Sequence, residues 1–82
     1  MYKVFGKQLR AERKKRGLTV QTIAKLCEIS RSYVTLIENG KRLPGRKILP
    51  KIASALETKT TVVLHWYLRD VGQKMHRDLK TS

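Results

Sequence analysis

Apolar residues recur along the chain at intervals of three or four, the spacing of one face of an α-helix. Phe5 and Leu9 begin the pattern in a segment rich in helix-forming residues, and Gly17 after it suits a C-terminal cap. We therefore expect a first helix over residues 5–16. No stretch alternates between apolar and polar residues as a strand would, so the pattern predicts an all-α fold of about five helices.

Two short periodic segments follow the first helix. Thr19 offers a hydroxyl cap to a second helix over residues 19–26, and Ser30 does the same for a third over residues 30–39. The three residues between them interrupt the pattern. Two short helices joined by so short a turn are the sequence outline of a helix-turn-helix.

The second half of the chain predicts two further helices. A loop over residues 41–45 contains a Pro-Gly pair, which favours a turn. Residues 46–56 are periodic again, and that helix should begin near Arg46 to Ile48 because Pro50 is tolerated only in a first turn. After another break, residues 61–79 predict a longer final helix.

The third helix has one face that its period turns outward. Val34 and Ile37 point toward the core. The opposite side then carries Arg31, Ser32, Thr35, Leu36 and Asn39, all of which form hydrogen bonds except the leucine. Side chains of this size reach base edges in a DNA major groove. The N-terminal end of such a helix usually enters deepest, so Arg31 and Ser32 are the first candidates for base contacts.

The charge of the chain supports an acidic partner. Nineteen Lys and Arg stand against six Asp and Glu among 82 residues, a net charge of +13. Many of the cations gather in two segments: Arg10, Arg13, Lys14, Lys15 and Arg16, then Lys41, Arg42, Arg46, Lys47 and Lys51. Nucleic acid is the commonest partner for such an excess. A solvated surface or an anionic membrane surface are the alternatives.

Several other classes of protein are excluded. The apolar run 62–64 is far shorter than the ~20 residues that span a bilayer, and no signal peptide is expected. Cys27, the lone cysteine, favours a reducing compartment such as the cytoplasm and reads as a small buried residue. His65 and His76 lack carboxylates or thiolates at metal spacing. Without a constellation of acid, base and nucleophile, we expect no enzyme, cofactor or metal.

The residues of the helix-turn-helix resemble a known family. The strings Gly17-Leu18-Thr19 and Ile23-Ala24, with the run over 29–42, are similar to lambda-repressor/Cro-like (XRE) proteins. The resemblance extends from about Phe5 to Leu56. It implies a five-helix domain that binds operator DNA, usually as a dimer on a pseudo-palindrome.

The resemblance also implies roles for single residues. Arg31, Ser32 and Leu36 match positions that read bases, and Thr35 shares their face. The matching phosphate contacts are Thr19, Gln21, Asn39, Lys41, Arg42, Arg46 and Lys47. Arg13 and Glu38 match an ion pair that ties the first helix to the end of the third in relatives.

The chain departs from the family pattern at three places. Val20 stands where many members carry a glutamine that touches the DNA backbone, and Gln21 is the substitute. Leu36 replaces a common polar reader and either packs on a thymine methyl or covers its neighbours. Glu57 takes the place of a glycine that often follows the fourth helix.

The last helix carries a second apolar row. Its members are spaced four, three and four residues apart: Leu64, Leu68, Val71 and Met75. Such a seam suits a partner helix, and a homodimer would place two recognition helices roughly 34 Å apart. Alternatively, Leu64 and Leu68 complete the monomer core together with Trp66. We assign residues 1–60 to the DNA-binding part and 61–82 to a dimerising or core-completing segment of the same domain.

The sequence thus predicts a regulator that binds specific double-stranded DNA, with phosphate contacts for affinity and base contacts for discrimination. Two alternatives stay open. One is an antitoxin-like module whose long last helix binds another protein. The other is a nonspecific nucleic-acid-binding polycation, which predicts nearly equal affinity for random duplexes.

Overall fold

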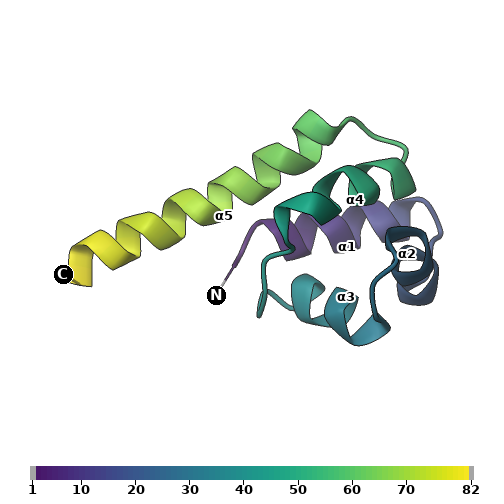
Figure 1. Ribbon diagram of the computed structural model, residues 1–82, viewed down its shortest axis with the longest axis horizontal. Helices are drawn as coiled ribbons and strands as arrows, with labels where there is room; N and C mark the ends of the chain where they lie inside the picture. The colour runs from purple at the N-terminus through teal and green to yellow at the C-terminus, as the bar shows by residue number, and fades with distance from the viewer. Residues whose placement is uncertain (1, 82) are drawn as a thin grey trace.

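The computed structural model describes the backbone of residues 2–81 and the side chains of residues 2–76 and 79. Within these residues it contains five α-helices, one short 3-10 turn and no strand (Figure 1). In chain order they are α1 (Phe5–Lys15), α2 (Val20–Cys27), α3 (Arg31–Glu38), η1 (Arg46–Ile48), α4 (Leu49–Ala55) and α5 (Thr60–Thr81). The predicted all-α class is confirmed.

The helix-turn-helix begins each of its helices at a side-chain cap. The Thr19 hydroxyl accepts a hydrogen bond from the backbone N–H of Thr22 at 3.1 Å, and the Ser30 hydroxyl accepts one from Tyr33 at 3.0 Å. Each bond satisfies a backbone donor that a helix start leaves without a partner. Both predicted caps are therefore confirmed, and α2 and α3 begin one residue after them.

The fourth helix starts later than its periodicity indicates. Residues 46–48 form the 3-10 turn η1, and α4 begins at Leu49 with Pro50 in its first turn. Glu57, after α4, adopts a left-handed backbone with φ of 54°, and Glu28 in the helix-turn-helix turn has φ of 58°. At both positions a glutamate thus adopts the left-handed backbone conformation that is usual for glycine.

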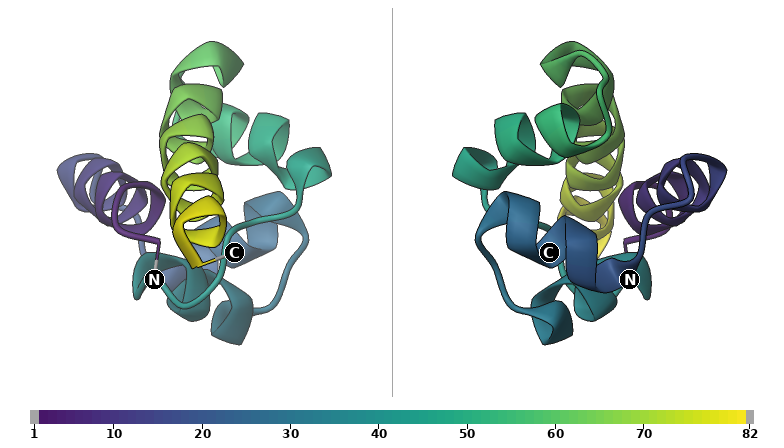
Figure 2. Two further views of the ribbon diagram at one scale, coloured as in Figure 1. Left: turned by 90° about the vertical axis from the view of Figure 1, so that its left-hand side faces the viewer. Right: turned by 90° about the vertical axis from the view of Figure 1, so that its right-hand side faces the viewer.

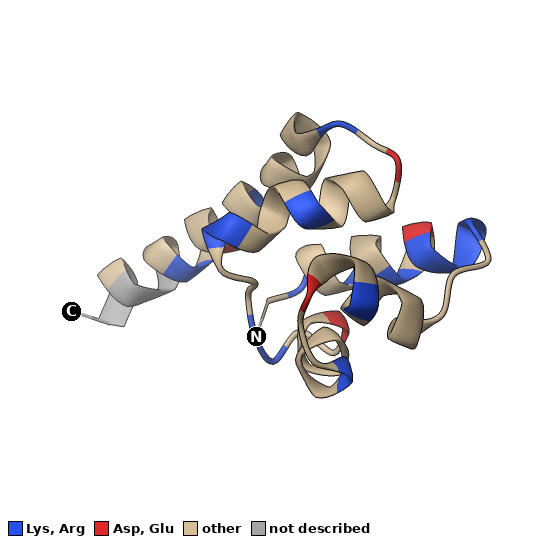
Figure 3. Ribbon diagram, turned by 45° about the vertical axis from the view of Figure 1, so that its right-hand side comes forward, with Lys and Arg blue, Asp and Glu red and all other residues tan. Residues whose placement is uncertain are grey.

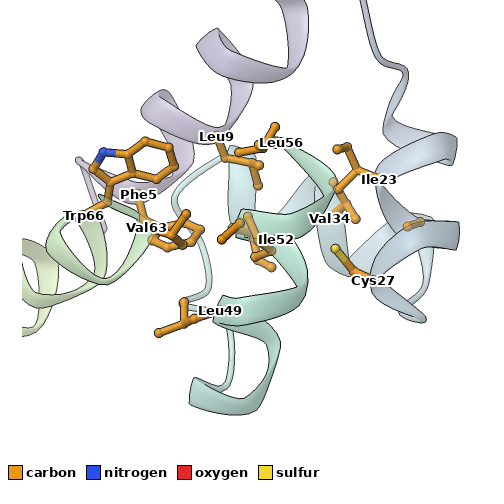
Figure 4. Packing of buried hydrophobic residues seen from close by; sticks show 13 residues of the cluster. Phe5, Leu9, Ile23, Cys27, Val34, Leu49, Ile52, Leu56, Val63 and Trp66 are labelled. Atoms are coloured by element: carbon orange, nitrogen blue, oxygen red, sulfur yellow. The ribbon is translucent and has the colours of Figure 1, made fainter. Parts of the chain in front are cut away.

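Every helix contributes to one core (Figure 4). Its largest buried side chains include Phe5, Leu9, Ile23, Val34, Ile37, Ile52, Leu56 and Val63. Phe5 and Trp66 meet edge to face with ring centroids 5.9 Å apart, which is a favoured aromatic geometry. Trp66 therefore completes the monomer core, whereas Leu64 and Leu68 remain exposed. The expectation that these two leucines also fill the core is wrong, because the helix turns only the flank with Val63 and Trp66 inward.

Cys27 belongs to this core. Its side chain is buried, and burial raises the pKa of the thiol, although the charge of Lys51 acts in the opposite direction. The thiol therefore stays protonated near neutral pH and packs as a small apolar group, as the sequence predicts.

The first half of α5 is fixed between α1 and α4 (Figure 2). Val4, which precedes α1, provides no side-chain cap. Asp70 of α5 fills this role from 65 and 66 residues away, since its carboxylate accepts hydrogen bonds from the N–H groups of Phe5 at 2.7 Å and Val4 at 3.0 Å. Asp70 is only 1% exposed, and a buried carboxylate at a helix N-terminus is favoured by the helix dipole.

Beyond Asp70 the second half of α5 extends away from the other helices (Figure 1). Among the helices that the structure describes, none is long and apolar enough to cross a membrane.

Candidate nucleic-acid interface

The outer face of α3 presents one continuous surface of mixed polar and apolar side chains. Val34 and Ile37 are buried, so the four candidate base readers face outward and line a shallow open hollow together: Arg31, Ser32, Thr35 and Leu36. Leu36 lies among three side chains that can form hydrogen bonds and is itself partly exposed. The geometry that the helical period predicts for this face is present in the structure.

The candidate phosphate ligands lie at both ends of the helix-turn-helix. All are exposed: Thr19, Gln21, Asn39, Lys41, Arg42, Arg46 and Lys47. The first two stand at the start of α2, and the others follow the C-terminal end of α3. Lys and Arg occur on each of the helices α1 to α5, with few acids between them (Figure 3). Charge alone therefore does not define the interface, and the outward face of α3 is needed to locate it.

Tyr33 holds the basic loop against α3. Its hydroxyl accepts a hydrogen bond from the backbone N–H of Gly45 at 3.2 Å. The guanidinium of Arg42 lies 5.9 Å from the centre of the same ring, within the range of a cation–π interaction. Two contacts to one side chain thus order the segment that carries Lys41 and Arg42. The sequence gives no local sign of this role.

Arg13 and Glu38 form a two-pronged ion pair between α1 and the end of α3. The Nε and Nη2 atoms of Arg13 donate to the two carboxylate oxygens of Glu38 at 2.7 and 3.0 Å. Arg13 also donates to the Leu18 carbonyl at 2.9 Å. The side chain of Glu38 is 2% exposed and that of Arg13 is 12% exposed. The hydrogen bonds with Glu38 raise the pKa of Arg13, although burial acts in the opposite direction, so the guanidinium stays charged.

Arg10 joins this pair from one turn earlier in α1. Its Nε lies 3.3 Å from Glu38, and its Nη2 donates to the side-chain oxygen of Asn39 at 2.8 Å. Sequence reasoning missed this contact because it joins residues 29 positions apart. The spacing of Arg10 and Arg13, one helical turn, is the only local signal that both face the same partner.

The apolar row of α5 faces solvent. Leu68 and Met75 are 54% and 59% exposed, Leu64 is also exposed, and Val71 is half-buried. By the helical period the row lies roughly 140° around α5 from the inward face that carries Val63, Trp66 and Asp70. The structure thus brings the four predicted interface residues together on one side of α5.

These features are those of a small helix-turn-helix protein, and comparison with known families agrees. The helix-turn-helix family model matches residues 9–63, from α1 to the start of α5. The chain therefore belongs to the XRE family of helix-turn-helix transcriptional regulators, which bind DNA and are not enzymes.

Individual relatives support the assignment. The chain is 33% identical over 79 residues to the HTH-type transcriptional regulator YqaF of Bacillus subtilis, covering 96% of this chain and 99% of YqaF. It is 32% identical over 74 residues to the transcriptional regulator ClgR of Mycobacterium tuberculosis, covering 90% of this chain but only 62% of ClgR. The crystal structure of the restriction-modification controller protein C.AhdI from Aeromonas hydrophila superposes with a TM-score of 0.68 at 36% identity, covering 72% of this chain and 89% of that one.

Proposed function

We propose that this regulator binds a pseudo-palindromic DNA operator as a homodimer, with α3 in the major groove. The observation that carries the proposal is the outward face of α3. It is continuous, combines three hydrogen-bonding side chains with Leu36, and is held in a fixed orientation by the buried pair of Arg13 and Glu38. A helix face of this mixed character, flanked by cations, can combine base readout with phosphate contacts.

The residues of this face divide by chemistry. Arg31 pairs with a guanine through two hydrogen bonds, the commonest specific contact in the major groove, and Ser32 and Thr35 add single hydrogen bonds. Leu36 packs on a thymine methyl. The phosphate ligands grip the backbone on both sides of the groove: Thr19 and Gln21 at one end, and Asn39, Lys41, Arg42, Arg46 and Lys47 at the other.

Arg31→Ala is expected to relax specificity at one base pair by ~1–3 kcal/mol, because the substitution removes a base contact. Lys41→Ala is the matched control, since loss of a phosphate contact weakens all sequences about equally. The operator is first selected from a random duplex pool, and both variants are then titrated against single-base operator variants.

Equal losses on every duplex after Arg31→Ala would contradict its assignment as a base reader. Nearly equal affinity of the wild-type protein for random duplexes, with a steep dependence on salt, would instead identify a nonspecific polycation.

The homodimer is proposed from α5. Residues 1–60 serve as the DNA-binding part, and 61–82 as the segment that docks α5 on the core and presents its apolar row. A row of large apolar side chains on a projecting helix is stabilised by a second copy of the same helix. Such a dimer would place two α3 helices on successive major grooves, roughly 34 Å apart.

Leu68→Glu is expected to convert the dimer into a monomer in sedimentation at tens of micromolar and to weaken binding to the full operator. Gln73→Glu is the control: it adds the same charge to an exposed position five residues later, about 140° around the helix. A monomeric wild-type protein, or equal effects of both substitutions, would refute the proposed interface.

A further inference from the structure

The N-terminal arm, α1 and the end of α3 enclose a basic hollow that lies outside the outer face of α3. It has a volume of about 560 Å³ and is lined by Tyr2, Lys3, Lys7, Arg10, Glu38, Asn39 and Gly40. Lys3 comes from the arm, and Lys7 and Arg10 lie one turn apart on the same side of α1. Three cations from two segments therefore converge beside the C-terminal end of α3.

The arm is held in place on both sides of Lys3. Before it, the backbone N–H of Tyr2 donates to the Gly40 carbonyl at 2.9 Å. After it, Val4 and Phe5 donate to the carboxylate of Asp70. Lys3 is thus anchored beside α3 rather than carried on a loose end.

Gly40 makes the close approach of the arm possible. It has φ of 74°, and a Cβ there would lie 2.7 Å from the Tyr2 carbonyl oxygen. Any other residue would be strained at this φ and would push the arm away.

The hollow keeps an excess of positive charge. Among the described residues that line it, Glu38 is the only acid, and both of its oxygens are already bonded to Arg13, with Arg10 close to one of them. Neither Lys3 nor Lys7 forms an ion pair with any side chain that the structure describes. Exposed lysines that converge in this way suit an anion with several oxygens, of which phosphate is the simplest.

Arg10 prepares Asn39 for the same ligand. Because Arg10 donates to the side-chain oxygen of Asn39, the amide NH₂ of Asn39 remains as the donor. Asn39 thereby connects the outer face of α3 with the hollow.

We propose that the hollow binds a phosphate of the operator backbone, next to the one held by Asn39, with Lys3 and Lys7 as ligands and Arg10 as a positioning residue. This inference rests on the proposed function, because it assigns part of the same DNA footprint. A backbone phosphate is favoured over a free anion because the hollow adjoins the end of α3, where the DNA backbone passes.

The test compares Lys3→Gln/Lys7→Gln with the wild-type protein in operator binding at several salt concentrations. Each phosphate that is no longer neutralised reduces the slope of log K against log salt by ~0.9. The proposed homodimer holds one such phosphate in each of its two half-sites, so the double substitution should reduce the slope by about 1.8. The affinity ratio of wild type to variant should then be roughly tenfold larger at 50 mM than at 200 mM salt. The preference among operator variants should not change.

Lys59→Gln/Lys74→Gln is the matched control. It removes the same charge from exposed positions, one on the connection between α4 and α5, opposite α3, and one on the projecting half of α5 (Figure 1). Ethylation interference locates the contact. In each half-site, one of the phosphates whose ethylation weakens binding of the wild type should no longer affect binding of Lys3→Gln/Lys7→Gln.

Equal slopes of log K against log salt for the two double variants would overturn the inference. Such a result would leave the proposed binding to a specific operator unaffected. The NMR signals of the arm could instead shift and saturate on titration with inorganic phosphate, while the salt dependence of DNA binding stays unchanged in the double variant. That result would also overturn the inference and assign the hollow to a small anion. A wild-type protein without any operator preference would instead contradict the proposed function itself.

Discussion

Replacing Glu38 with alanine is expected to lower the free energy of unfolding by about 3 kcal/mol. The substitution leaves the guanidinium of Arg13 largely buried and without its carboxylate, and stranding one partner of a buried pair typically costs about 3–5 kcal/mol. The value lies at the low end because Arg13 is 12% exposed and keeps its bond to the Leu18 carbonyl. Urea denaturation with an unchanged m-value would measure the loss.

Glu12→Ala is the control for this prediction. Glu12 pairs at 3.5 Å with Arg16, the residue that follows α1, and both side chains are accessible to water. Exposed pairs of this kind contribute about 0.3–0.5 kcal/mol, so the control should scarcely change stability. A cost of less than 1 kcal/mol for Glu38→Ala would show that the pair does not fix α3.

Glu38→Gln separates stability from recognition. Glutamine has nearly the same shape as glutamate and keeps one acceptor oxygen. The protein should therefore fold, and it should lose only part of the free energy of unfolding that Glu38→Ala loses. Its operator affinity should fall while its base preferences stay the same, because the pair orients α3 and contacts no base.

The parts of the fold that could be predicted are those decided locally. Thr19 and Ser30 cap the helices that follow them, and a cap needs only residues three positions away. The outward face of α3 follows from the helical period once Val34 and Ile37 are assigned to the core. The roles of Arg13 and Glu38 came from family resemblance, since nothing local joins residues 25 positions apart.

The parts that could not be predicted depend on contacts between distant segments. The bond from Gly45 to Tyr33 and the basic hollow exist only after the loop and the arm have folded onto α3. The left-handed backbone of Glu57 gives no sign in the residue type, because the chain reversal after α4 imposes it. Asp70 left a partial signal: with Val63 and Trp66 it follows the spacing of an inward helix face, where an acid requires a buried partner.

Asp70→Ala is expected to destabilise the protein by about 2–4 kcal/mol. The substitution removes the acceptor of two backbone N–H groups at the start of α1, and each buried donor left unsatisfied costs about 1–3 kcal/mol. It also removes a negative charge from the N-terminus of a helix that has no side-chain cap of its own. Urea denaturation measures this loss, with Gln73→Ala at an exposed position of the projecting half of α5 as the control.

Asp70→Asn distinguishes the charge from the hydrogen bonds. The amide keeps one oxygen acceptor but turns a donor toward the second N–H, so about half of the loss should remain. In both variants the amide protons of Val4 and Phe5 should exchange faster than in the wild type, because local opening of the arm no longer breaks bonds to a carboxylate. Since the same arm carries Lys3, Asp70→Asn should also reduce the salt dependence of DNA binding. Unchanged exchange at Val4 and Phe5 would show that Asp70 does not hold the start of α1.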